Sequence, residues 1–299
     1  MSGPPVLLPV VGLSANPVTD LHNLLAYSFM VNAFRAGAAI AVLASAVGWF
    51  MVLRRQSFVG HTIAVVGFPG AAGATLVGLS AFGGYFTFCF LAALLIAVVP
   101  TTAGKAFSDE NAVTGTVQAF LLGLGFLFAS LYGGNLNGID ALLFGNFLGI
   151  SNAEVVVLAV ICVVTVAAVA VLWEPLLFAS IDPEMAAARG LPVRGLGVAF
   201  LLLLGLAAAG ASQMTGALLV FALLVMPAAT VQQLTSRPVL GLWLTLVLAV
   251  AITWAGLAVS YYSPYPIGFW ITTIAFAGYL ASHLPTLHRR ARRQRHPRA

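Results

Sequence analysis

The sequence predicts an all-α fold, a polytopic bundle of membrane-spanning helices, and three observations support this. The chain is 61% hydrophobic and only 7% charged, whereas a water-soluble domain carries about 25% charged residues. Its apolar stretches recur at lengths close to the about 20 residues that cross a bilayer. Its basic residues fall almost entirely on one side of those stretches. A lipid bilayer is therefore the predicted solvent of this chain.

Roughly nine stretches are long and apolar enough for membrane helices. They cover residues 27–53, 62–82, 84–103, 112–132, 154–173, 196–211, 215–234, 239–260 and 267–285. The segment ALLFGNFLGI at 141–150 is too short to cross, and we interpret it as a re-entrant half-helix. The predicted organisation is an N-terminal arm at 1–26, a transmembrane domain at 27–285 and a basic tail at 286–299.

The charge distribution predicts the orientation. With alternating crossings, 12 of the 13 Lys and Arg residues fall on one side, and the exception, Arg35, lies inside the first span. Because positive charge is retained on the cytoplasmic side, we expect a multi-pass membrane protein with its N-terminus outside and its C-terminus in the cytoplasm. The basic tail then anchors the last span on anionic lipid. No folded basic surface suggests nucleic-acid binding.

Glycine and proline occur within the expected spans. The chain has 30 glycines, and small residues let membrane helices approach closely. Gly67–Gly70, Pro100 and Pro227 are expected to interrupt their spans. Since broken helices are common where a solute crosses the bilayer, these positions favour a transporter or channel over a purely structural scaffold.

A short helix is predicted on the cytoplasmic side, between the fifth and sixth spans, at about 182–190. Asp182 is suited to the N-cap, Pro183 to the first helical position and Glu184 to the positive end of the helix dipole. Gly190 is suited to the left-handed residue that ends a helix. Such a helix is either a connector on the membrane surface or a docking element for a cytoplasmic partner.

The chain lacks the sequence motifs of an enzyme. No G-x-x-x-x-G-K-[ST] motif is present, so the chain has no nucleotide site of that kind, and it has no H-E-x-x-H motif. His61 has no nearby carboxylate and no serine in the ten residues after it, which argues against an intramembrane enzyme. Cys89 and Cys162 lie in separate apolar runs, so neither a disulfide nor a Cys-type metal site is indicated.

Five blocks of the sequence, in this order, resemble the permease subunit of metal-importing ABC transporters, which take up zinc, manganese or iron in bacteria. They are VLRRQSFVGHTIAVVGFPGAAGA, SDENAVTG, LLFGNFLGIS, ASIDPEMAAARGLPV and TGALLVFALLVMPAAT. The resemblance covers about residues 35–285, and makes the transmembrane domain at 27–285 a permease domain.

The resemblance implies three protein partners. They are a cytoplasmic ATP-binding cassette subunit, an extracytoplasmic substrate-binding protein and a second permease chain, forming a homodimer. The short cytoplasmic helix would be the coupling helix that docks on the ATPase, and its residues are Asp182, Pro183, Glu184, Ala187 and Gly190. No cofactor is expected in this chain, because the partner subunit uses the ATP.

In the block that contains His61, the family usually carries an Asp, a His four residues later, and then Pro-Gly. A spacing of four places two side chains on one helical face, and carboxylate and imidazole are ligands for divalent transition metals. Aligned on Pro69 and Gly70, the Asp position is His61 and the His position is Val65. His61 is therefore either a surviving metal ligand or a polar residue at the membrane interface.

The leading hypothesis is a permease for a transition-metal ion. The alternative is the same architecture importing a metal complex or another small solute that is not a metal, because the family pair is altered. Further pathway candidates are Pro69, Gly70, Asp140 and Pro227, of which Asp140 flanks the half-helix on the outer side.

Overall fold

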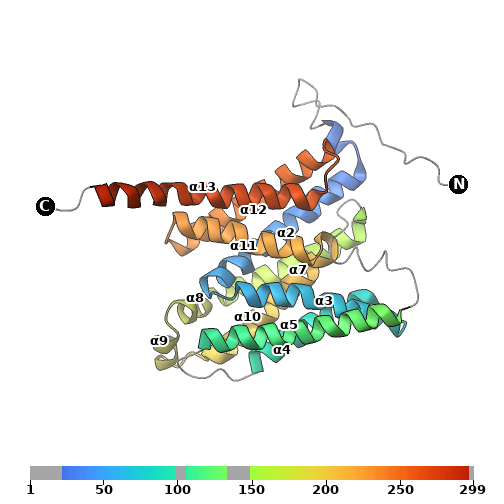
Figure 1. The fold of residues 1–299 in the computed structure, drawn as a ribbon, viewed down its shortest axis with the longest axis horizontal. Coiled ribbons are helices and arrows are strands. Elements are labelled where there is room, and N and C mark those ends of the chain that lie inside the picture. Colours follow the sequence, from blue (N-terminus) through green and yellow to red (C-terminus); the bar gives the residue numbers. More distant parts are fainter. Residues whose placement is uncertain (1–21, 99–105, 133–148, 296–299) are drawn as a thin grey trace.

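The computed structural model describes residues 22–98, 106–132 and 149–295, and their long elements are α-helices. The helices pack as one bundle, which confirms the predicted polytopic fold (Figure 1). Their bounds are α2 Ser28–Leu53, α3 Ser57–Leu76, α4 Ala81–Val98, α5 Ala106–Leu131, α7 Asn152–Val171, α8 Trp173–Ile181, α9 Pro183–Ala188, α10 Val193–Thr215, α11 Ala217–Leu234, α12 Pro238–Tyr261 and α13 Ile267–Arg295.

Seven helices of the described residues are long and apolar enough to cross a membrane, namely α2, α3, α4, α5, α7, α10 and α12. The two other expected spans correspond to α11 and α13. The half-helix expected at 141–150 lies outside the described residues except for its last two. Asn32 of α2 donates a hydrogen bond to the carbonyl of one of these, Ile150 (3.1 Å).

The second span begins earlier than expected. Its apolar run predicts a start at residue 62, but α3 begins at Ser57. The turn that precedes it is made by Arg55, which has a positive φ of 59° without being a glycine, and Gly78 at 74° follows the far end of α3. Residues 57–61 contain no proline, and their one glycine, Gly60, is accommodated in the helix, so His61 lies one turn inside it.

The expectation that proline interrupts these spans is wrong at two positions. Pro69 lies inside α3 and Pro227 inside α11, and both helices continue through them. Pro100 lies outside the described residues. Membrane helices accommodate proline because neighbouring helices supply other partners for the backbone, a compensation that is not visible in a local sequence pattern.

The partner that supports α3 before Pro69 is α4. Tyr85 donates a hydrogen bond from its hydroxyl to the carbonyl of Ala64 (2.6 Å), and the Cys89 thiol donates one to the carbonyl of Ile63 (3.3 Å). Both donors are fully buried. A Cβ on Gly67 would meet the Tyr85 ring at 2.0 Å, so only glycine leaves room for this ring.

One turn further, the backbones of α3 and α4 come into direct contact. A Cβ on Gly70 would lie 2.3 Å from the carbonyl oxygen of Gly84, and a Cβ on Gly84 would lie 2.2 Å from that of Gly70. Neither backbone atom can move aside as a flexible side chain does. These two glycines therefore set the distance between the two helices.

Basic residues gather at one end of the bundle. Arg54, after α2, donates a hydrogen bond to Ser180 of α8 (3.2 Å), and the ring of Trp49 stacks on that of Trp173 at 5.8 Å. The α2–α3 turn and the α8–α9 segment, which ends at Arg189, thus lie together. Figure 1 shows α9 and the C-terminal part of α13 towards the same side of the bundle.

We predict that Gly84→Val destabilises the bundle, whereas Gly83→Val does not. The valine at 84 would overlap the α3 backbone, and overpacking of this kind costs about 1–3 kcal/mol or more. A Cβ on Gly83 meets nothing within 4 Å, so the same substitution there is a matched control. The melting temperature in detergent measures both. Equal melting of the two variants would contradict the packing described here.

Candidate translocation site and docking helix

The imidazole of His61 faces helix α11. Its ring centroid lies 4.7 Å from that of Phe221, with the two planes tilted by 60°. The side chain is half-buried, and its Nδ1 atom is buried without a hydrogen bond to the described residues. A buried polar nitrogen without a partner is costly. His61 thus keeps a donor or acceptor available on the inner face of the bundle.

The next residue of α3 faces α5. The hydroxyl of Thr62, which is fully buried, donates a hydrogen bond to Oε1 of Gln118 (2.8 Å). Gln118 is half-buried. Its hydrogen bond with Thr62 places an amide group of the apolar helix α5 beside the start of α3. Helix α3 thus presents His61 to α11 and Thr62 to α5, on two different sides of the helix.

Val65, one turn after His61, is 7% exposed. It occupies the position at which the family resemblance implies a histidine, and its side chain offers no metal ligand. The described residues contain no group of three or more His, Cys, Asp and Glu side chains that could hold a metal ion. His61 would therefore be the single ligand that the described residues offer to a passing cation. The other ligands of the ion would come from outside these residues.

The other pathway candidates have different positions. Pro69 and Gly70 are buried between α3, α4 and α5, and Pro227 is buried in α11. Asp140 lies outside the described residues. Glu154, near the expected outer side, caps α7, because its carboxylate accepts hydrogen bonds from the backbone and hydroxyl of Ser151 (2.7 and 2.8 Å).

Helix α9 has the predicted caps. The Asp182 carboxylate accepts a hydrogen bond from the backbone N–H of Met185 (2.9 Å), and Pro183 is the first helical residue. Glu184 lies exposed in the first turn, and Gly190 follows the helix with a φ of 82°. The helix has six residues, so it is shorter than the 182–190 range suggested.

One side of α9 packs on the bundle and the other is free. Ala186 is fully buried against Ala179 of α8 and Leu196 of α10. Ala187 is exposed and Met185 is 49% exposed. The free side therefore presents small apolar groups at the basic end of the molecule, where a partner protein can bury them.

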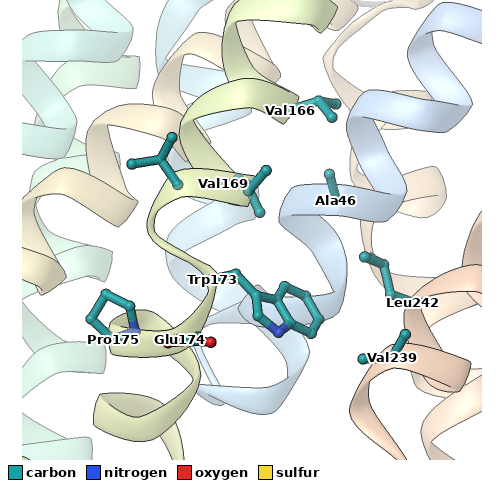
Figure 2. A pocket seen from close by; sticks show the side chains of 10 residues that line it. Ala46, Val166, Val169, Trp173, Glu174, Pro175, Val239 and Leu242 are labelled. Carbon is teal, nitrogen blue, oxygen red and sulfur yellow. The ribbon is translucent and has the colours of Figure 1, made fainter.

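A groove of about 450 Å³ opens between α2, α7, α8 and α12 at the same end. Its walls are apolar, including Ala46, Val166 and Trp173, and Glu174 is its one ionisable group (Figure 2). One carboxylate in apolar surroundings does not form a metal site. The groove is therefore not the candidate translocation site.

Sequence reasoning missed two residues that the fold brings into play, and it considered Gln118 only as a weaker candidate for lining a path. Gln118 stands out because an amide in an apolar span is uncommon and needs a partner. Phe221 carries no local signal, since its contact with His61 depends on how α3 and α11 pack. Arg54 was interpreted only as a topology determinant, although it contacts α8 and α10.

Taken together, a multi-pass helical bundle, an imidazole nitrogen buried inside it without a partner among the described residues, and an exposed capped helix at its basic end fit a membrane permease. The family model of the ABC 3 transport family matches residues 26–285. The chain belongs to this family, as its resemblance implied. It is a permease subunit, and in this family the ATPase is a separate polypeptide.

Three relatives illustrate the similarity. The manganese transport system membrane protein MntC of Listeria monocytogenes is 31% identical, over 73% of this chain and 76% of the relative. The chelated iron transport system membrane protein YfeC of Yersinia pestis is 30% identical, over 91% and 94%. The solved PsaBC of Streptococcus pneumoniae, in complex with a Fab, has a chain with TM-score 0.78 and 25% identity, covering 89% of this chain and 95% of that one.

Proposed function

We propose that this chain is the membrane-spanning permease subunit of an ATP-driven importer for a transition-metal ion such as Mn²⁺, iron or Zn²⁺. The observation that carries the proposal is family membership over residues 26–285, with relatives named for manganese and chelated iron transport. The exposed side of α9 supports it, since an importer permease without a nucleotide site needs a surface on which an ATPase docks.

The proposed assembly has three further components. A cytoplasmic ATP-binding cassette subunit binds α9, a substrate-binding protein delivers the ion from outside, and a second copy of this chain completes the pathway. A second copy also fits the ligand count, because one imidazole in each chain becomes two around a shared path.

Within the chain, the proposed pathway runs past His61. A cation crossing the bilayer needs polar groups that replace part of its hydration shell. His61 supplies such a group on the side of α3 that faces α11, whereas Thr62 and Gln118 are hydrogen-bonded to each other between α3 and α5. The neighbouring Val65 leaves the path apolar where the family usually has a second ligand.

We expect His61→Ala to lower uptake of Mn²⁺ by about tenfold, since even groups that only orient metal ligands have effects of this size. The loss should be larger at pH 7.5 than at pH 5. Imidazole binds a metal ion only when it is neutral, so lowering the pH progressively removes this ligand from the parent protein as well. Uptake into proteoliposomes across a panel of metal ions measures this.

The double variant His61→Asp/Val65→His restores the usual family pair. It should raise transition-metal flux or widen its specificity if the substrate is a bare ion. Impaired uptake in the double variant, together with normal uptake in His61→Ala, would instead favour a metal complex as substrate. Equal uptake by the parent protein and His61→Ala at every pH and for every metal would remove His61 from the mechanism.

We expect Ala187→Asp to abolish transport without unfolding the permease. The new carboxylate would be buried, without a partner, against the docked ATPase, and such a charge costs about 3 kcal/mol or more. Co-purification of the ATPase and ATP-driven uptake measure the effect. Ser236→Asp places the same charge in the exposed α11–α12 turn and is the control. Normal uptake and normal co-purification by Ala187→Asp would refute the docking role.

The basic end of the bundle is expected to face the cytoplasm. A tag after residue 299 should then react with a membrane-impermeant reagent only in opened cells, because positively charged loops are retained inside. Labelling of this tag in intact cells would overturn the charge argument and require an even number of crossings.

A further inference from the structure

The guanidinium of Arg54 lies where three parts of the permease meet. Arg54 caps the C-terminal end of α2, two residues before Gln56, the N-cap of α3. Its Nε donates a hydrogen bond to Oε1 of Gln56 (3.1 Å), and its Nη1 donates one to Oγ of Ser180 on α8 (3.2 Å). The guanidinium carbon lies 5.3 Å from the centre of the Phe200 ring on α10.

Ser180 connects Arg54 to α8, the helix that leads into the docking helix α9. Its hydroxyl donates in turn to the carbonyl of Leu176 (2.5 Å), so it bonds both the α8 backbone and Arg54. Asp182, the N-cap of α9, follows two residues later. Helices α8 and α9 are further joined by Arg189, whose guanidinium lies 5.2 Å over the Phe178 ring. A displacement of α9 therefore moves Ser180 with it.

On the C-terminal side of Arg54, the chain enters α3, the helix of the candidate pathway. The chain turns sharply at Arg55 and then enters α3, where His61 lies one turn inside the helix. Helix α3 packs closely on α4 through its glycine contacts, so a displacement at the start of α3 acts on both helices. The α2–α3 turn is thus the point at which α8 is hydrogen-bonded to the start of α3.

We propose that Arg54 is a positioning residue that couples the docking helix to the pathway helix. Its planar fork holds Gln56 and Ser180 at once while its face rests on Phe200, a set of contacts that the point charge of a lysine does not reproduce. The inference rests on the proposed function, since it assumes that an ATPase binds α9. Arg54 would act through its hydrogen bond to Ser180 and not through contact with the ion.

Arg54→Lys tests the link because it keeps the charge and removes the fork. In proteoliposomes with the ATPase and the Mn²⁺-loaded binding protein, we expect ATPase binding and ATP hydrolysis to persist while Mn²⁺ uptake per ATP falls about tenfold, a usual size for coupling between sites. Arg55→Lys is the matched control. Its side chain is exposed and its backbone strain is unchanged, so uptake per ATP should stay at the parent value.

Ser180 supplies the second variant. Ser180→Ala removes the acceptor of the Arg54 bond and should uncouple transport as Arg54→Lys does, whereas Ser180→Thr keeps a hydroxyl and should restore coupling. If both residues act through one link, the double variant Arg54→Lys/Ser180→Ala is no worse than Arg54→Lys alone. Additive losses would overturn the proposal, and so would normal uptake per ATP in Ser180→Ala.

The outcomes separate this inference from the proposed function. A parent protein that shows no ATP-driven Mn²⁺ uptake with its partners contradicts the proposed function. A parent protein that transports, with Arg54→Lys and Ser180→Ala transporting equally well, contradicts only the coupling role. If Arg54→Lys fails to fold, as its melting temperature would show, the two Ser180 variants decide the question.

Discussion

The contact between the backbones of α3 and α4 at Gly70 and Gly84 is the constraint on which the rest of the bundle depends. In a bilayer no hydrophobic effect drives helices together, so close van der Waals contact and hydrogen bonds must hold them. Tyr85 adds a bond to the α3 backbone at Ala64, nearer the start of the helix. Since α4 occupies this face of α3, His61 and Thr62 are left to face α11 and α5.

The features that were predictable from the sequence are those that a short segment determines alone. Low charge and long apolar runs predict membrane helices, and the caps at Asp182 and Gly190 predict α9, because each depends only on neighbouring residues. The start of α3 was not predictable, since its turn uses a positive φ at Arg55, a residue type that rarely adopts one. Continuity through Pro69 depends on a neighbouring helix, which a local pattern does not contain.

The candidate site follows the same division. His61 stands out because an ionisable group in an apolar run is costly and needs a reason. Its environment did not follow, because Phe221 and Gln118 come from helices whose packing is a tertiary property. The exposed side of α9 was only partly predictable from the sequence. The sequence predicts the helix, whereas only the packing of Ala186 against α8 and α10 identifies Ala187 as a residue on the free side.

Under the proposed function, a valine at position 65, where the resemblance implies a histidine, has a physical consequence for transport. A pathway must bind its ion well enough to admit it and weakly enough to release it. Affinity for a transition metal rises with the number of nitrogen and oxygen ligands, and this stretch of α3 supplies one imidazole in place of a carboxylate–imidazole pair. Weak binding in the pathway shifts selectivity to the protein that delivers the ion. The main task of the permease is then to couple ion passage to ATP hydrolysis, through the docking helix and the α2–α3 turn. Discrimination between metals is a smaller part of that task.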